Sequence, residues 1–193
     1  RDDVESRGLG DVYKRQAQVY WFEDISALSA AEFPADMEED FILPMVKIAL
    51  SQKPSYPSWQ DFTEAFPDDD DDEAFNTAWE ELTGEDAEEL PDRSQLLGWP
   101  DVIQNSMFEE CDIAAKGYYL GNPEGWKKIP KKIRQEAEET AKDCWMLLLQ
   151  LDTVECDDFE LMFGDCGHIY FYITKEDLKA RRFDNIWLIL QCF

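Results

Sequence analysis

Apolar side chains recur at helical spacing in three stretches of the chain. Residues 59–66 carry an apolar stripe, and Ser58 and Asp61 at its start are spaced as a capping box. A helix is therefore predicted there. Residues 75–82 repeat the i, i+3, i+4, i+7 spacing and predict a second helix. A third helix is predicted over 130–143, with proline in its first turn.

The later part of the chain changes to the period of two that is typical of strands. Residues 145–151 (WMLLLQL) form a nearly continuous apolar run, which predicts a central strand. The turn at 164–167 (GDCG) separates two further strand patterns and predicts a hairpin. Together with two short β-rich runs near the start, the expected strands besides 145–151 are 19–25, 45–50, 159–163, 168–173 and 186–193. A short helix is expected at 177–181, after Thr174.

These patterns predict an α+β fold with an antiparallel, β-rich C-terminal core and several flanking helices.

Residues 1–16 have little apolar content and no hydrophobic periodicity, and their end (GDVYKRQ) resembles translated sequencing-adapter sequence. We therefore expect 1–16 to be a non-native leader. Residues 17–193 are expected to form a single domain that lacks its N-terminal part, with an acidic helical segment at 58–92 and a β-rich core at 95–193.

The composition of the chain disfavours several classes of function. The 193 residues include 44 Asp and Glu against 18 Lys and Arg, a formal net charge of -26, which disfavours binding to nucleic acid or to anionic membranes. Five scattered cysteines without a CxxC spacing argue against a disulfide framework or a zinc ribbon and favour a reducing compartment. No apolar run is long enough for a membrane span. We expect a cytoplasmic protein without a cofactor; the oligomeric state stays open.

Several short motifs occur together in a fixed order. They are QLLGWPDVIQ at 95–104, WMLLLQLD at 145–152, FGDCG at 163–167 with the strand after it, and DNIWLILQ at 184–191. In this combination the chain resembles the YwqG-like family of uncharacterised proteins. The resemblance implies an α+β fold but no established activity, substrate or cofactor. Members are often discussed as immunity or interaction proteins near polymorphic-toxin genes.

The chain departs from that family at two places. Phe163 stands where a tryptophan is common, and Ser94-Gln95 stands where a histidine often lies close to the first motif. The missing histidine weakens a hydrolase-like interpretation.

The turn Gly164-Asp165-Cys166-Gly167 is the most motif-like feature, and a tight hairpin turn is its simplest explanation. A sharper hypothesis joins Asp165 to His168, the only histidine, in a metal-dependent or acid/base site. One histidine does not make a typical structural zinc site, so we predict no metal centre. The further carboxylates of this hypothetical site would be Asp152, Asp157, Asp158 and Glu160.

Trp99 and Gln104 form a second candidate site. The turn LGWP could present Trp99 to a ligand or partner, with Gln104 as a hydrogen-bonding group, although Trp99 also suits a plug in the core.

The acidic runs are either a solvated face or a surface that attracts a basic partner. The candidate partner surface is Asp68, Asp69, Asp70, Asp71, Asp72 and Glu73. Without an assembled catalytic motif, the sequence favours a non-catalytic, acidic protein-binding module, immunity-like against a basic toxin. The alternative is a metal-dependent or ligand-binding, enzyme-like site around Asp165 and His168.

Overall fold

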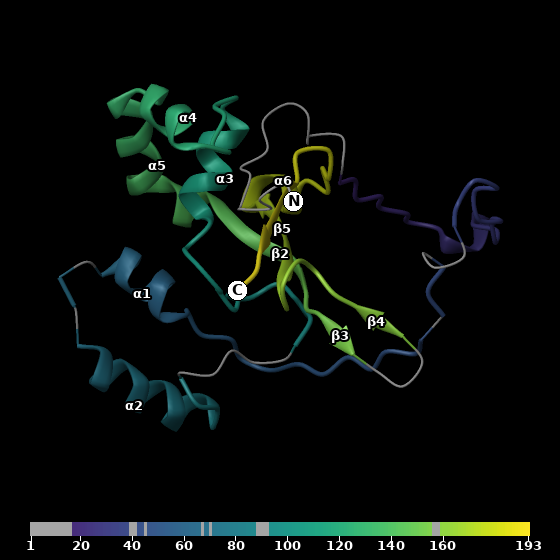
Figure 1. The fold of residues 1–193 in the computed structure, drawn as a ribbon, viewed down its shortest axis with the longest axis horizontal. Helices are drawn as coiled ribbons and strands as arrows, with labels where there is room; N and C mark the ends of the chain where they lie inside the picture. The colour runs from purple at the N-terminus through teal and green to yellow at the C-terminus, as the bar shows by residue number, and fades with distance from the viewer. Residues whose placement is uncertain are drawn as a thin grey trace.

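A computed structural model of the chain describes residues 17–38, 42–44, 46–66, 68–69, 71–87, 93–155 and 159–193. These residues form an α+β fold, drawn in Figure 1. Its helices are the 3-10 turn η1 (Ile25–Ala27), α1 (Trp59–Ala65), α2 (Asp72–Thr83), α3 (Phe108–Ala115), α4 (Pro123–Lys128), α5 (Lys131–Cys144) and α6 (Lys175–Lys179). Its strands are β1 (Gln95–Leu96), β2 (Trp145–Leu151), β3 (Val154–Glu155), β4 (Glu160–Leu161), β5 (His168–Thr174) and β6 (Trp187–Gln191).

The main sheet has four antiparallel strands in the order β1-β2-β5-β6. The apolar strand β2 is central, as its sequence predicts. Its register with β5 shifts between Leu147 and Leu149, and the carbonyl of Leu148 in this bulge accepts a hydrogen bond from the Leu97 amide at 3.1 Å. The bulge therefore ties the LLGWP turn to the middle of the sheet.

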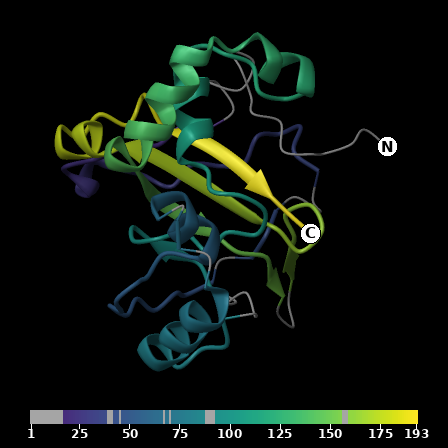
Figure 2. The same ribbon diagram turned by 90° about the vertical axis from the view of Figure 1, so that its left-hand side faces the viewer.

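Helices α3 and α5 cover one face of this sheet, and Figure 2 shows them grouped above the strands with α1 and α2 below. Because alternate side chains of a strand point to opposite faces, one set from each strand reaches the helices. The side chains of Ala137 and Ala141 are small and fully buried, which lets α5 approach closely. The core includes Met107, Phe108, Cys111, Ile113, Leu147, Tyr170, Tyr172, Trp187 and Ile189.

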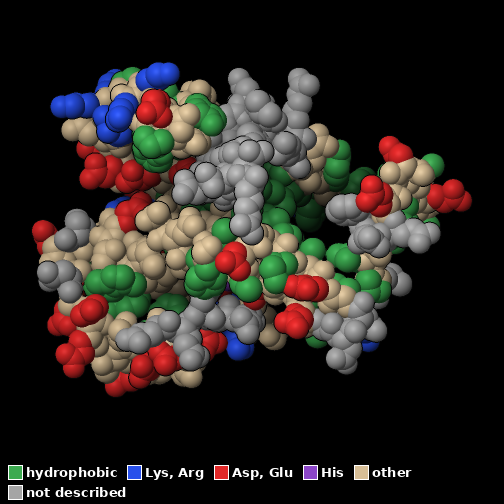
Figure 3. Space-filling view, viewed as in Figure 1, with side chains coloured by type: hydrophobic (Ala, Val, Ile, Leu, Met, Phe, Trp, Pro, Cys, Tyr) green, Lys and Arg blue, Asp and Glu red, His purple; other side chains and the backbone are tan. Residues whose placement is uncertain are grey.

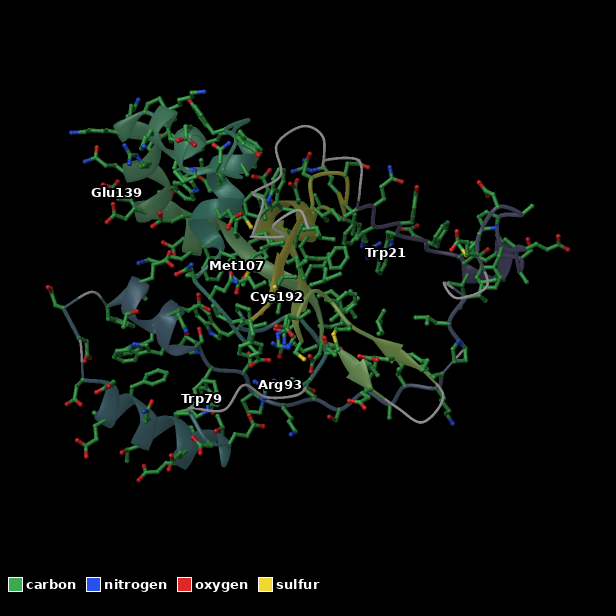
Figure 4. All side chains as sticks on the ribbon, in the orientation of Figure 1. Trp21, Trp79, Arg93, Met107, Glu139 and Cys192 are labelled. Atoms are coloured by element: carbon green, nitrogen blue, oxygen red, sulfur yellow. The ribbon has the colours of Figure 1, made fainter. Side chains whose placement is uncertain are left out.

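Helices α1 and α2 share an aromatic cluster of their own. The ring of Phe75 on α2 lies 5.1 Å from that of Trp59 and 5.2 Å from that of Phe62, both on α1. Trp79 is 8% exposed, and Figure 4 shows it on the side of α2 that faces α1. These contacts explain the helical stripes seen in the sequence.

The predicted helix starts are confirmed by capping hydrogen bonds. Ser58 Oγ accepts from the Asp61 amide at 3.3 Å at the start of α1, and Thr174 Oγ1 accepts from the Asp177 amide at 3.0 Å at the start of α6. The helix expected over 130–143 is α5.

Two strand predictions and the hairpin prediction are wrong. Residues 19–25 form a loop that leads into η1, and residues 46–50 contain no strand, while Met45 lies outside the described residues. The strand patterns around the GDCG turn do not pair as a hairpin. β5 pairs with β2 and β6, β4 pairs with β3, and Phe163 and Gly167 form an isolated bridge. β-Forming residues make a strand only where a partner edge is available.

Within the part of the chain that the structure describes, every helix is too short or too polar to cross a bilayer. The leader expected at 1–16 lies outside that part.

Candidate functional site

His168 is the first residue of β5, and its side chain is buried and hydrogen-bonded within the protein. It is 1% exposed; its Nε2 lies 2.8 Å from Asp152 Oδ1 and its Nδ1 lies 3.1 Å from the Tyr170 hydroxyl. That hydroxyl donates to the carbonyl of Asp101 at 2.6 Å. Both ring nitrogens are thus engaged inside the protein, where a substrate has no access.

The other residues of the predicted Asp165–His168 site do not join this pair. Asp165 is exposed in the turn, and its carbonyl accepts from the Phe193 amide at 3.2 Å. Glu160 is exposed on β4, while Asp157 and Asp158 lie outside the described residues. Among the described side chains, no three of His, Cys, Asp and Glu come together in a way that could hold a metal ion.

Gly167, the second glycine of the GDCG turn, is required by the close approach of neighbouring backbone. A Cβ atom at Gly167 would lie 2.3 Å from the carbonyl oxygen of Phe163 and 2.4 Å from that of Gln191. Only glycine permits this close approach of three backbone segments.

Trp99 and Gln104 are both tied to the protein. The Trp99 ring is half-buried and packs edge-on against Phe108 at 5.9 Å. The Gln104 side chain is exposed, and its Nε2 donates to the Cys192 carbonyl at 2.7 Å.

Two glutamines of the sheet hold the loop that contains these residues. Gln150 on β2 is fully buried; its Oε1 accepts from the Asp101 amide at 2.9 Å, and its Nε2 donates to Asp101 Oδ2 at 2.8 Å. The buried Asp101 carboxylate also receives two hydrogen bonds from Arg93, at 2.9 and 2.6 Å. Such a bidentate pair fixes position and orientation together. Figure 4 labels Arg93 within this dense cluster of polar side chains.

Gln191 on β6 fixes the next part of the loop. Its Oε1 accepts from the amides of Ile103 and Gln104, both at 3.1 Å, and its Nε2 donates to the Asn105 carbonyl at 2.8 Å. The position of Asn105 and of the adjacent Ser106 therefore depends on the sheet.

Asn105 and Ser106 lead into a pocket of about 720 Å³ between α1, α3 and α4. This volume suits a small molecule or a single large side chain. Its lining is acidic and amide-rich, with an indole at one wall. The lining residues are Gln60, Thr63 and Glu64 from α1, Asn105 and Ser106 from the loop, Glu109 and Glu110 from α3, and Leu120 and Trp126 from the segment through α4.

Asp61 on α1 is not among the lining residues, and it is buried beside Ser106, which is. It is 2% exposed, and burial raises its pKa to about 7. The charge of Glu64 adds to this rise, whereas side-chain hydrogen bonds with Ser106 and Ser58 lower the pKa.

The two glutamates of α3 are perturbed as well. Burial raises the pKa of Glu110 to about 7. Burial also raises the pKa of Glu109, and the charges of Glu64 and Glu138 add to the rise while Lys142 opposes it. Carboxyl groups with raised pKa values in a cleft are a recognised mark of a functional site.

The sequence model of one protein family, described as Domain of unknown function (DUF1963), matches residues 4–192. The chain belongs to this family. No curated protein matches the chain at a significant level. Gln150 and Gln191 lie in the LLLQ and LILQ motifs, so in this DUF1963 chain both motifs hold the loop that forms one wall of the pocket.

The predicted acidic surface of the DUF1963 chain lies at the start of α2. Asp68, Asp69, Asp71, Asp72 and Glu73 are exposed, whereas Asp70 lies outside the described residues. Figure 3 shows acidic side chains along the edge formed by α2 and beneath the α3–α5 group.

Sequence reasoning missed the pocket. One signal was present, because Asp61 and Glu64 are spaced i, i+3 and therefore share a face of α1. The contribution of Glu109 and Glu110 comes from α3, which the sequence pattern did not predict.

Proposed function

We propose that this protein is a non-catalytic binding module that engages a basic protein partner through α1, α2 and the acidic pocket. One observation carries the proposal. The segment 54–92 contains no lysine and no arginine, and its helices present carboxylates both on the exposed start of α2 and in the pocket wall. A surface of a single sign attracts and orients an oppositely charged partner.

The YwqG-like resemblance supports a finer form of the same proposal, in which the partner is a basic toxin and the protein is immunity-like. The enzyme-like alternative at Asp165 and His168 has no specific observation in its favour, because His168 is buried and its ring nitrogens bond to Asp152 and Tyr170.

A labelled peptide of alternating lysine and serine tests the long-range electrostatic part of the proposal. We expect binding by fluorescence anisotropy that weakens about tenfold or more between about 50 and about 300 mM NaCl, because salt screens surface charges. A peptide of alternating glutamate and serine should not bind. Lysine-peptide binding that is absent at low salt, or that is unaffected by salt, would contradict the proposal.

A variant with the acidic surface neutralised locates the interaction. Asparagine keeps the α2 cap at position 71, where Asp71 Oδ1 accepts from the Ala74 amide at 2.9 Å. We expect weaker peptide binding by Asp68→Asn, Asp69→Asn, Asp71→Asn, Asp72→Asn and Glu73→Gln combined. The matched control removes five exposed charges elsewhere, by Glu32→Gln, Glu124→Gln, Glu139→Gln, Glu155→Gln and Glu160→Gln. Equal losses in both variants would mean that net charge alone, and no particular surface, determines binding.

A further inference from the structure

Strand β6 lies at the edge of the main sheet, although its sequence is typical of a central strand. Among the described strands, β5 alone pairs with it. The residues of β6 are WLILQ, and the whole run 186–193 contains no charged residue and no proline. A continuous apolar run of this kind is typical of strands in the interior of a sheet, buried on both faces. The position of β6 and its sequence therefore disagree.

The outer edge of β6 has none of the usual protections against pairing with another strand. Natural edge strands are very short, bulged or interrupted by proline, or they carry charges, especially on lysine. The opposite edge strand, β1, is two residues long, whereas β6 pairs with β5 in an unbroken register from Trp187 to Gln191. Figure 2 shows β6, in yellow, in front of the other strands of the sheet. The outward N–H and C=O groups of such an edge are a template for a further strand.

A strand added at this edge would meet apolar side chains on both faces of the sheet. Trp187 and Ile189 are buried in the core on the side of α3 and α5. Leu188 and Leu190 are half-buried on the other face, where their cross-strand neighbours on β5 are Phe171 and Ile169. The added strand must therefore be apolar on both of its own faces, a condition that β6 itself meets.

We propose that β6 pairs with β6 of a second copy of the chain, antiparallel and about a two-fold axis. The two four-stranded sheets then form one continuous sheet of eight strands. A two-fold contact uses the same surface on both copies, so a self-complementary strand suffices. Each copy carries a net charge of -26, and an uncharged strand is a contact at which two such chains can meet without placing carboxylates opposite each other. The inference is independent of the proposed function, because neither α2 nor the acidic pocket is part of this contact.

Sedimentation velocity of the wild-type protein tests the pairing. We expect the mass to rise from 22.5 kDa towards twice that value as the concentration increases from about 1 to about 100 μM. A reducing buffer excludes cross-linking through the exposed thiols of Cys144 and Cys166. Salt should favour the dimer, because it screens the repulsion between two acidic copies. This effect is opposite in sign to the weakening that salt should cause in lysine–serine peptide binding.

A lysine placed on the edge strand locates the contact. Leu188→Lys should weaken the dimer about tenfold or more, because pairing would bury part of the new charge. The matched control is Leu149→Lys, on the same face but on β2, two strands away from the edge. This control should still form the dimer. Both variants gain one positive charge and so repel a second copy less than the wild type does. A loss of dimer in Leu188→Lys alone therefore cannot come from net charge.

Hydrogen exchange provides a second measurement, which needs no variant and so holds even if Leu188→Lys fails to fold. In the wild type, exchange of the amides in 186–193 should slow as the protein concentration rises, because the outward N–H groups gain partners.

Three results would overturn the inference. The first is a wild type that stays monomeric over the whole concentration range; slow exchange of its β6 amides would then mean that the chain covers its own edge. The second is an unchanged dimer in a folded Leu188→Lys. The third is an equal loss of dimer in Leu149→Lys, which would place the contact on the face of the sheet.

Discussion

Asp61 couples the stability of the protein to pH. Its pKa rises from 3.8 to about 7 in the folded state because burial disfavours the charged form. The folded state therefore holds a proton that the unfolded state releases, so stability is greatest below the unfolded pKa and is lost as pH rises through about 7. A rise of about three pH units corresponds to at most about 4 kcal/mol.

Asp61→Asn should remove this pH-dependent loss, because asparagine keeps the shape and has no charge to bury. We expect the melting temperature of the wild type to fall more steeply than that of Asp61→Asn between about pH 5 and about pH 8. Differential scanning fluorimetry across this range measures the difference, with Glu155→Gln as the control for loss of one exposed carboxylate. Parallel profiles for the wild type and Asp61→Asn would mean that the Asp61 carboxyl group is solvated in solution.

At the scale of elements, the ion pair between Arg93 and Asp101 joins the segment after α2 to the loop between β1 and α3. Arg93 also contacts Glu85, at 3.0 Å, on the short segment that follows α2. We predict that Arg93→Ala destabilises the protein by about 3 kcal/mol, since Asp101 is 4% exposed and would keep a buried charge without its cation. Urea unfolding provides the measurement.

Lys132→Ala is the matched control for Arg93→Ala. Lys132 forms an exposed pair with Glu136 at 3.5 Å, which should contribute about 0.5 kcal/mol or less. Similar losses in the two variants would show that the hydrogen bonds from Gln150 and Gln95 satisfy Asp101 without Arg93.

The elements differed in how well the sequence predicted them, and the reasons are local. α1, α2 and α5 carry an apolar stripe at helical spacing, and β2 is a long apolar run, so their local patterns sufficed. α3 was missed because apolar and charged residues are interleaved over only eight positions, and its N-cap residue Met107 makes no capping bond. α4 did carry a signal, since Asn122 caps it and Pro123 begins it.

The candidate site was less predictable than the fold. Its acidic walls are more than 40 residues apart in the sequence, and they meet because Gln191 fixes Asn105 beside α1 and α3. No local pattern encodes that meeting. His168 drew attention as the only histidine, yet its burial beside Asp152 and Tyr170 follows from the pairing of β5 with β2 and β6. Side-chain type alone could not distinguish a site from a buried hydrogen-bond network.

At the scale of the whole molecule, negative charge and packing are unevenly distributed. A buried hydrophobic cluster lies between the sheet and α3 and α5, whereas the side chains of α1 and α2 also pack in an aromatic cluster of their own. Segment 54–92, which includes both helices, has no basic residue. Repulsion among its carboxylates therefore opposes the folding of this segment, and a bound cationic partner would relieve it.

This uneven distribution predicts that salt stabilises the protein. With a net charge of -26, the melting temperature should rise by several degrees between about 20 and about 500 mM NaCl, because the Debye length shortens and repulsion weakens.

The combined neutralisation at positions 68, 69, 71, 72 and 73 should raise the melting temperature at low salt and reduce the further gain from salt. The five-site control variant should change both less, since its charges are dispersed over other elements. Comparing sodium chloride with sodium sulfate at equal ionic strength separates screening from the general stabilisation by sulfate. An equal salt response in both variants would mean that repulsion is spread over the whole surface, without concentration at α2.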